Sequence, residues 1–430
     1  MRLEAPCTSE GGERGTQLTR LDPAKGEAAH AYPHFLPDGK HFIFLNRGGP
    51  GDANTLALKS LDSDPITPLT QADAVVGYAD PGYLLWVRRR SPLARAFDSS
   101  KLQLNGEPFL VAEKVSYSSD SAATLVSVSR SGTVVFLTNS FEQKQFVIVD
   151  RAGRLLRTLG PPGASTEFRA TPDGARLALS LADESNGAQD LWAIDVERGT
   201  LTRITSSPVD ETDPLFSPDG SRLAFSSDRN GMCDIYLRSA SGIGEETQLL
   251  HSDGDKFSGA WSPDGKYLVY MTYDPVKRRD IWLFPLEGDK KARSLIGTNA
   301  NETEPAISSD GHWMAYASTE SGAFEVYLTS FPVPTNRRQG STSGGHYPHW
   351  SSDGRHLFCS NDGQLVEVPV EVGDAVKFGA PKVLFTKPEG ARGDFVALKN
   401  GREFILQTAV PRAAAEPIHV LLDWAAGLKQ

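Results

Sequence analysis

Six polar residues of differing charge are the strongest candidates for a binding site in this sequence. Each precedes a short apolar segment, and the six segments belong to successive sequence repeats. Because carboxylate, ammonium and imidazole groups are mixed among them, together they could bind a polar small ligand or a peptide at a concave surface. No two of them have a spacing that identifies a general acid and a general base, so no catalytic residue is predicted. The six candidates are Glu167, Asp213, Lys256, Glu304, His346 and Asp394.

The histidines of the sequence do not form a recognised metal-binding motif. His346 and His349 flank Tyr347 and Pro348, and His356 lies beyond the next turn, but the sequence lacks His-Glu-x-x-His. Proline between two histidines also opposes the helix that would place both imidazoles on one face. We therefore predict no metal site and no cofactor.

Nucleophilic catalysis is not indicated either. Residues 340–344 are Gly-Ser-Thr-Ser-Gly, with threonine where the nucleophile elbow of a serine hydrolase has serine. The three cysteines, Cys7, Cys233 and Cys359, form no Cys-x-x-Cys pair. We expect Cys233 and Cys359 to be buried free thiols, with a disulfide between them as the alternative. The chain is therefore expected to bind rather than to catalyse.

The charge and hydropathy of the chain argue against two classes of partner. Lys and Arg number 44 and Asp and Glu 54, which gives a formal charge of -10. Nucleic-acid binding needs a basic face that displaces counterions, so it is not predicted. No segment approaches the roughly 18 consecutive apolar residues of a membrane-spanning helix. Residues 1–15 are polar, lack the apolar centre of a signal peptide, and are expected to be disordered.

A recurring turn defines the elements that would position the candidate residues. Nine turn dipeptides that contain glycine lie between short apolar segments, with successive glycines 42 to 50 residues apart. A period of about 40 to 50 residues is typical of four-stranded propeller blades. The dipeptides are Asp38-Gly39, Pro81-Gly82, Ser131-Gly132, Asp173-Gly174, Asp219-Gly220, Asp264-Gly265, Asp310-Gly311, Asp353-Gly354 and Asn400-Gly401.

Each repeat has the same internal order, for which residues 213–250 are the example. Ser-Pro-Asp-Gly at 217–220 suits a tight turn, because proline fixes φ at about −65° and glycine accepts positive φ. Short apolar strands at 222–227, 234–237 and 247–250 follow the turn. No long segment has helical periodicity. The sequence therefore predicts an all-β propeller built from four-stranded antiparallel blades.

An acidic residue recurs before the third strand of four repeats, at Asp190, Asp234, Asp280 and Glu325. A role that repeats in every blade is structural rather than catalytic, so we expect these carboxylates to hold turns through backbone N–H groups. The six candidates named first differ in charge between repeats, and we expect them at the mouth of a central channel.

Two family resemblances extend this interpretation. Residues 217–236 closely resemble the repeat of TolB-family propellers through Ser-Pro-Asp-Gly, Ser-Asp-Arg-Asn-Gly and Asp-Ile-Tyr. Other segments resemble the C-terminal propeller of acidobacterial-type serine/threonine protein kinases, namely 35–42, 81–85, 94–98, 149–153, 344–350 and 420–424. In that family a cytoplasmic kinase domain and a membrane helix precede the propeller sensor. This sequence lacks the Gly-rich phosphate loop, His-Arg-Asp and Asp-Phe-Gly, so the resemblance does not imply kinase activity.

The nine turns are compatible with two arrangements. We expect residues 143–430 to form a six-bladed TolB-like propeller and residues 16–142 to form about three blades of a partial propeller. The last strand, 418–424, would then close the ring with a strand from 143–160. The alternative is one closed ring of eight or nine blades, in which residues 16–19 complete the last sheet. A partial propeller would leave open sheet edges, which natural proteins avoid.

These features predict a non-catalytic recognition module that binds a protein or a small polar ligand and is monomeric. The kinase resemblance implies a sensor region in a periplasmic or other extracytoplasmic location. Two alternatives remain open, a TolB-like periplasmic protein-interaction factor and a propeller hydrolase with its site in the channel.

Overall fold

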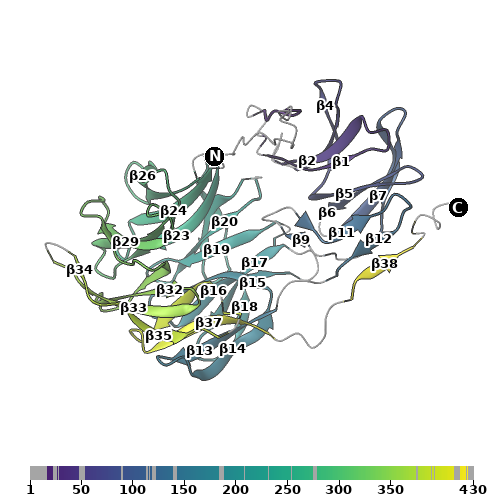
Figure 1. Ribbon diagram of the computed structural model, residues 1–430. Helices are drawn as coiled ribbons and strands as arrows, with labels where there is room; N and C mark the ends of the chain where they lie inside the picture. The colour runs from purple at the N-terminus through teal and green to yellow at the C-terminus, as the bar shows by residue number, and fades with distance from the viewer. Residues whose placement is uncertain are drawn as a thin grey trace. The chain divides into compact units, whose positions relative to one another are not determined.

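Every regular element that the computed structural model describes is a β-strand (Figure 1). None of the described segments is a helix that could cross a membrane. The chain forms two compact units, chiefly Glu142–Asp183 with Ala188–Pro411 and Glu4–Phe141 with Arg412–Gln430. The described residues are 17–22, 27, 29–47, 54–88, 91–112, 115, 117–118, 123–138, 143–183, 188–207, 209–230, 232–252, 254–274, 278–373, 376–388, 390–391, 393–410, 417–422 and 424.

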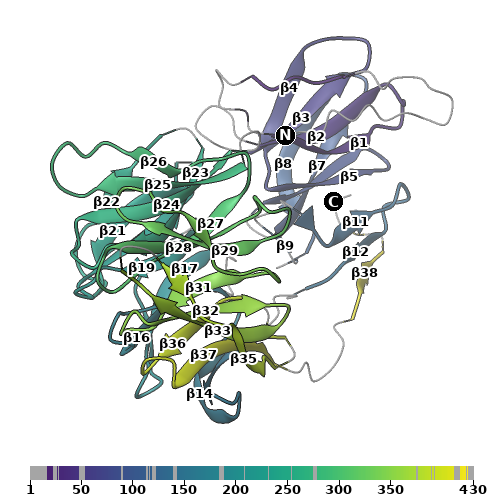
Figure 2. The same ribbon diagram turned by 60° about the vertical axis from the view of Figure 1, so that its left-hand side comes forward.

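The larger unit contains six antiparallel sheets among its described residues (Figure 2). Four are four-stranded sheets in chain order: β15 (Ser165–Ala170), β16 (Arg176–Ala182), β17 (Gln189–Asp195) and β18 (Leu201–Arg203); β19 (Glu211–Phe216), β20 (Arg222–Ser227), β21 (Asp234–Ser239) and β22 (Thr247–Leu250); β23 (Asp255–Trp261), β24 (Tyr267–Asp274), β25 (Arg278–Pro285) and β26 (Arg293–Ile296); and β27 (Glu302–Ile307), β28 (Trp313–Ser318), β29 (Glu325–Ser330) and β30 (Arg338–Gln339).

The two remaining sheets of the larger unit depart from this simple order. In one, β33 pairs with both of the strands that follow it, and the strands are β31 (His346–Trp350), β32 (His356–Asn361), β33 (Gln364–Glu371), β34 (Lys377–Phe378) and β35 (Lys382–Thr386). The other joins the beginning and the end of the unit in the order β14 (Leu155–Gly163), β13 (Lys144–Asp150), β37 (Glu403–Ala409) and β36 (Phe395–Leu398).

The pairing of β13 with β37 corrects the strand closure expected from the sequence. A strand from 143–160 does take part, with Ile148 opposite Ile405, but its partner is 403–409 and not 418–424. The physical reason is burial. Ile405 and its neighbours in β37 are completely buried, so both faces of that strand meet other sheets, whereas the end of the chain keeps exposed apolar side chains. A strand with two covered faces is the better closing element.

Side chains between the sheets form the core of the larger unit. Inner strands contact one another in the order β15, β19, β23, β27, β31 and β36. A buried cluster of Phe168, Leu177, Val396 and Leu398 then joins β36 back to the sheet of β15. Each such fully buried apolar side chain contributes roughly 1.5–3 kcal/mol, so packing between sheets supplies most of the driving force.

The predicted Ser-x-Asp-Gly turns are confirmed, and one hydrogen-bond pattern explains their recurrence. After β19, Ser217 Oγ–H donates to Asp219 Oδ1 (2.5 Å) and accepts from the Arg222 N–H (2.9 Å). The Ser221 N–H donates to the same Asp219 carboxylate (3.0 Å). Gly220 has a φ of +67°, a conformation that residues other than glycine avoid. The serine accepts a backbone N–H in the same way after β23, β27 and β31, at Ser262, Ser308 and Ser351.

Ser217→Ala should lower the free energy of unfolding by about 1–2 kcal/mol, because the Arg222 N–H loses its acceptor and Asp219 loses a donor. Urea denaturation followed by fluorescence measures the change. Ser241→Ala, in an exposed turn, is the matched control and should stay within about 0.5 kcal/mol of the parent protein. Equal losses in the two variants would contradict a structural role for the Ser217 hydroxyl.

The smaller unit contains described sheets of two to four strands. Two are four-stranded: β1 (Ala29–Phe35), β2 (His41–Arg47), β3 (Thr55–Ser60) and β4 (Ile66–Gln71); and β5 (Ala74–Ala79), β6 (Tyr83–Arg88), β7 (Ser91–Asp98) and β8 (Gln103–Leu110). A described three-stranded sheet has the order β11 (Val126–Val128), β12 (Val134–Phe136) and β38 (His419–Leu421), and a two-stranded one joins β9 (Tyr117–Ser118) and β10 (Ala123–Thr124). Its core includes Leu84, Trp86 and Val134.

Several remaining expectations can be compared with these elements. Of the segment 16–19 expected to complete a single large ring, residues 17–19 form no strand and Thr16 lies outside the described residues, as do residues 1–15. Cys233 and Cys359 are free thiols, so the alternative of a disulfide between them is wrong. Burial raises the pKa of Cys359 to about 12, so this thiol is unreactive at neutral pH.

Candidate functional site

A recurring β-bulge shapes the inner strands of the larger unit. The pairing register shifts between Thr212 and Leu215 in β19, and it shifts at the corresponding place in β15, β23, β27 and β31. Asp213, Glu304 and Tyr347 lie within these bulges, each before a proline, with φ of +49°, +57° and +53°. Positive φ is uncommon for residues other than glycine. A bulge changes the direction of the side chain at the extra residue, so these three side chains point away from the regular alternation of their strands.

Eight polar or aromatic residues from five of the six sheets form what we call the inner-strand cluster. The charges of Asp394, Asp213, Glu304 and Glu167 all raise the pKa of the Arg169 guanidinium, and Asp394 forms an ion pair with it. Four of the six sequence candidates are therefore brought together around a cation that the sequence analysis did not select. The members of the inner-strand cluster are Glu167, Arg169, Asp213, Glu304, His346, Tyr347, His349 and Asp394.

Asp394 is the most tightly held carboxylate of the cluster. It forms an ion pair with Arg169 and accepts a hydrogen bond from the Phe395 N–H (2.7 Å). His349 Nε2 lies 2.8 Å from Asp394 Oδ1, the same oxygen that accepts the Phe395 N–H. Burial alone would raise the pKa of Asp394, but Arg169 and His349 hold that pKa below its ordinary value. Asp394 is therefore ionised and links β15, β31 and β36.

Glu304 connects β27 to the next inner strand, β31. Its Oε2 accepts the Tyr347 N–H at 2.6 Å, and its Oε1 lies 3.6 Å from His346 Nδ1. The interaction with Glu304 raises the pKa of His346, while burial, with nearby carboxylates, raises the pKa of Tyr347 to about 12. The Tyr347 hydroxyl therefore stays protonated and can donate a hydrogen bond.

Asp213 differs from Asp394 in its electrostatic surroundings. Burial, with a further contribution from the Glu167 charge, raises the pKa of Asp213 to about 7. Thr212 Oγ1–H donates to its carboxylate (3.0 Å), and the Ser258 hydroxyl donates to its backbone carbonyl. Asp213 can therefore present either a carboxylate or a carboxylic acid to a ligand near neutral pH.

Lys256 does not belong to the inner-strand cluster, which corrects the sequence-based assignment. Its side chain is completely buried, and its ammonium donates to Asp234 Oδ1 (2.9 Å) and to the carbonyls of Ser252 (2.5 Å) and Gly254 (2.7 Å). Three hydrogen bonds satisfy the ammonium, so Lys256 has no donor left for a ligand. Its role is to join β21 to the beginning of β23.

An alignment of the repeats could have found the cluster more accurately. Counting back seven residues from the turn glycine gives Glu167, Asp213, Ser258, Glu304, Tyr347 and Asp394. Lys256 and His346 stand outside this position, and polarity alone selected them. Arg169 and His349 were missed because they are flanked by apolar strand residues and their partner Asp394 is distant in sequence. Tyr347 was passed over for its polar neighbour His346.

Two of the four acidic residues before the third strands hold backbone N–H groups, as predicted, and a third pairs with side chains. Asp190 Oδ1 accepts the Ser207 N–H (2.8 Å), and Glu325 Oε1 accepts the Gly344 N–H (2.9 Å). Asp234 accepts from Gln248 (2.9 Å) as well as from Lys256. Each of these carboxylates therefore fixes the segment that precedes or follows an outer strand.

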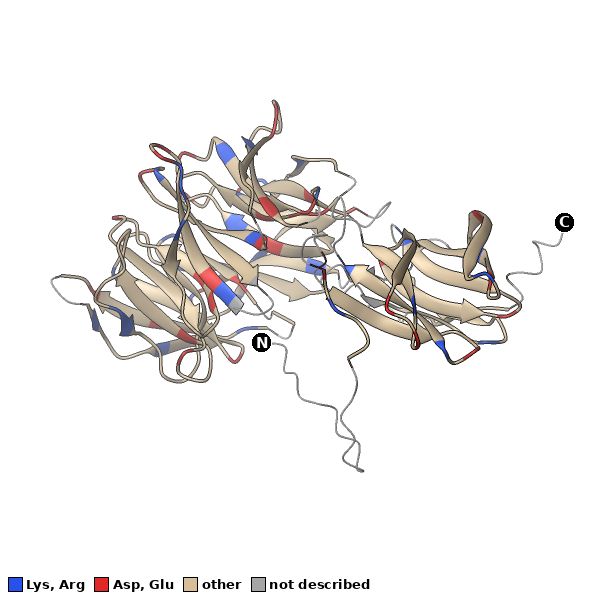
Figure 3. Ribbon diagram, turned by 90° about the horizontal axis from the view of Figure 1, so that it is seen from above, with Lys and Arg blue, Asp and Glu red and all other residues tan. Residues whose placement is uncertain are grey.

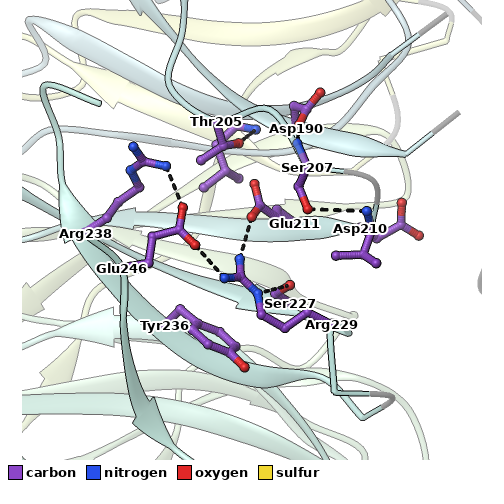
Figure 4. A network of polar contacts seen from close by, with 12 residues as sticks. Asp190, Thr205, Ser207, Asp210, Glu211, Ser227, Arg229, Tyr236, Arg238 and Glu246 are labelled. Atoms are coloured by element: carbon purple, nitrogen blue, oxygen red, sulfur yellow. Dashed lines mark hydrogen bonds and ion pairs between the residues drawn. The ribbon is translucent and has the colours of Figure 1, made fainter. Parts of the chain in front are cut away.

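A second polar network lies within the sheet of β19 to β22 (Figure 4). Arg229 pairs with Glu211 (2.6 Å) and with Glu246 (2.5 Å), and Glu246 also pairs with Arg238 (2.6 Å). The Arg229 guanidinium carbon lies 4.2 Å from the centroid of the Tyr236 ring. Burial raises the pKa of Glu211, which is 1% exposed, to about 7. These ion pairs lie within one sheet and stabilise it, and Thr205, which follows the preceding sheet, also interacts with the Glu211 carboxyl (Figure 4).

Charged residues outside these networks are mixed in sign. Lys and Arg lie among Asp and Glu on the strands and loops of both units (Figure 3). A surface of this kind suits partners recognised by specific polar contacts rather than by a single strong electrostatic field.

Comparisons with known proteins agree with the repeat pattern. Residues 159–278 match the TolB beta propeller domain family, PD40. The Tol-Pal system protein TolB of Helicobacter hepaticus is 25% identical over 170 residues, which are 38% of this chain and 39% of that protein. TolB of Helicobacter pylori strain 26695 is 27% identical over 158 residues, 36% of this chain and 37% of that protein. The chain thus spans about two fifths of these curated relatives.

One solved structure has the same architecture over a larger share of the chain. The putative TolB from Agrobacterium tumefaciens superposes with a TM-score of 0.50 at 19% identity, and the match covers 63% of this chain and 99% of that one. This likeness concerns the fold alone. Together with the antiparallel sheets and the family match, it shows that the chain has an all-β, TolB-like propeller fold.

Proposed function

We propose that this chain is a non-catalytic recognition module whose larger unit is a six-bladed propeller that binds a protein partner at the inner-strand cluster. The observation that carries the proposal is a set of contacts between inner strands, in which Asp394 pairs with Arg169 and lies beside His349 while Glu304 accepts the Tyr347 N–H. The charges of Asp213, Glu304 and Glu167 also act on Arg169. Polar groups that meet at the centre of rigid sheets are suited to specific binding, because the scaffold positions them in advance.

The local contacts favour binding over acid–base chemistry. Asp394 and Glu304 are held by backbone N–H groups and by histidines of β31, so their oxygens are fixed acceptors. Asp213 and Tyr347 add groups that can donate a hydrogen bond near neutral pH. A fixed set of acceptors and donors of both charge signs matches a polar segment of a folded or extended partner protein.

The relatives supply the second part of the proposal. They are named as proteins of the Tol-Pal system. We propose that this chain contacts another protein in an extracytoplasmic compartment. The resemblance to kinase-linked propellers adds a finer proposal, in which the partner or ligand is the signal of a sensor region.

Affinity capture with paired variants tests this function. The parent protein and an Asp213→Asn/Glu304→Gln variant are used as baits against an envelope extract of the source organism, and captured proteins are quantified by mass spectrometry. We expect a partner that the variant captures at least tenfold less, because the variant loses two carboxylates. A loss of about 1.4 kcal/mol of binding free energy already weakens binding tenfold. A Glu245→Gln/Glu287→Gln variant, altered at two exposed positions, should capture it normally. Equal capture by all three baits would contradict the proposal.

A further inference from the structure

We propose that β38 is an interaction edge and that it pairs, antiparallel, with β38 of a second copy of this chain about a twofold axis at Val420. The inference concerns the smaller unit and does not depend on the function proposed for the larger one. It differs from the monomer expected from the sequence.

The first observation is the position of β38 in its sheet. The described sheet has the order β11, β12 and β38, and β12 is the neighbour recorded for β38. The other blade-like sheets of both units have four or five strands. Within the described part of the chain, β38 therefore occupies the third place in its sheet and presents a free row of backbone donors and acceptors where the other sheets have an outer strand.

The second observation is that β38 lacks the protection found on most other outer strands. Natural edge strands are blunted by proline, which cannot donate to a further strand, or by charged side chains. Residues 418–422 are Ile-His-Val-Leu-Leu, without proline, lysine, arginine or a carboxylate, and Pro417 and Asp423 flank them in the sequence. Apart from β22, the outer strands elsewhere in the chain carry such residues, namely Pro68 in β4, Pro108 in β8, Pro161 in β14, Arg203 in β18, Arg293 in β26, Arg338 in β30 and Lys382 in β35.

The third observation is an exposed apolar row formed by Val420 of β38 and the two residues that flank the strand, Ile418 and Leu422. Ile418, Val420 and Leu422 are 69%, 54% and 69% exposed, and they alternate with His419 and Leu421, which face the core. Val420 lies opposite Val135 of β12, so the row continues onto the neighbouring strand. Exposed apolar side chains of this size, gathered along an unprotected edge, are typical of an interaction surface.

The pattern of the row identifies a second copy as the occupant. Antiparallel pairing about Val420 places Val420 opposite Val420 of the second copy and Ile418 opposite its Leu422. Every exposed apolar side chain of one strand then meets an apolar side chain of the other at the cross-strand distance of about 4.5–5.5 Å. This match follows because the sequence around Val420 is symmetric in its alternation, as an isologous twofold contact requires. The absence of charge at 418–422 removes like-charge repulsion at the contact, although the whole chain carries -10.

Light scattering after size exclusion, on the full chain, tests the proposal. At concentrations up to roughly 100 µM, which covers weak interfaces, the parent protein should reach twice the mass of one chain. Val420→Lys should remain at the mass of one chain, because two ammonium groups would face each other across the axis. Ile243→Lys, which changes a 79% exposed apolar residue in the larger unit, should still form the dimer. A parent protein that stays at the mass of one chain over this range overturns the proposal.

A cysteine variant gives a second reading that does not depend on how well Val420→Lys folds. In Val420→Cys the two thiols would lie opposite each other, and mild oxidation should convert most of the chain into a reducible covalent dimer. The parent protein and Ile243→Cys, treated in the same way, should stay largely monomeric on a non-reducing gel. Similar crosslinking of all three proteins, or of none, would exclude the twofold pairing. Capture of an unrelated strand by β38 in place of a second copy would also exclude it.

Discussion

Gly401→Ala is expected to lower the free energy of unfolding by about 3 kcal/mol, whereas Gly265→Ala should cost about 1 kcal/mol. The two glycines occupy equivalent positions in the turns of two different repeats, with φ of +74° and +73°. An added methyl group at Gly265 meets no atom within 4 Å, but at Gly401 it overlaps the ring of Phe358. Both variants therefore carry the strain of positive φ, and only Gly401→Ala adds overpacking. Urea denaturation of the two variants measures the difference directly.

The location of Gly401 explains why the larger effect falls there. Phe358 is completely buried and packs on Phe404 of β37 with ring centroids 5.3 Å apart. Since β37 pairs with β13, a displaced Phe358 ring disturbs the sheet that joins the two ends of the larger unit. Phe358→Leu combined with Gly401→Ala should recover part of the lost stability by making room. Equal costs for Gly401→Ala and Gly265→Ala would show that the Phe358 contact does not matter.

Arg229→Met should destabilise the protein by about 3 kcal/mol at pH 8, and by clearly less at pH 5. Arg229 is the partner of the buried Glu211 carboxylate and also pairs with Glu246. Without it, an ionised Glu211 would be buried without compensation. The pKa of Glu211 is raised from 4.5 to about 7 in the folded protein. At pH 5 the carboxyl is protonated in the fold, so the loss of the guanidinium matters less. Denaturation at the two pH values measures both losses.

The same shift fixes the sign of the pH dependence in the parent protein. A carboxyl whose pKa is higher in the folded state binds its proton more tightly there, so its contribution to stability is present below pH 4.5 and is lost as pH rises from 4.5 to about 7. Glu211→Gln should flatten the stability profile in this window. In the Arg229→Met background it should also restore most of the stability at pH 8. A Glu211→Gln profile parallel to that of the parent would contradict the assigned pKa.

Local features of the fold were predictable because they depend on a few residues close in sequence. The turn at 217–220 follows from the Ser217 hydroxyl, the Asp219 carboxylate and a glycine with positive φ, and all three act within five residues. Strand positions follow from the same turns. The structural role of Asp190 was likewise visible from its regular recurrence.

Long-range pairing was not predictable in the same way. The segments 403–409 and 418–424 both contain short apolar runs, and burial on two faces distinguishes the one that pairs with β13. Nothing in a local pattern records how many faces will be covered. The end of the chain therefore joined the smaller unit, contrary to expectation.

The candidate site was predictable in part for a related reason. Asp213 and Glu304 were selected because a polar residue precedes the inner strand of each repeat, and this signal is local. The strand at 255–261 has Ser258 in the corresponding place, and the prediction fell instead on Lys256, whose ammonium in fact pairs with Asp234 of another sheet. Arg169 gave no signal, because its partner Asp394 is 225 residues away.

Hydrogen–deuterium exchange on the captured complex tests the central claim, that the inner-strand cluster is the binding site. Exchange is compared between the free protein and the protein bound to the partner isolated by affinity capture. We expect slower exchange at the segments that carry the cluster, 165–170, 211–216, 302–307 and 346–350. Protection confined to the outer strands β18, β22 and β26, with the inner strands unchanged, would contradict it.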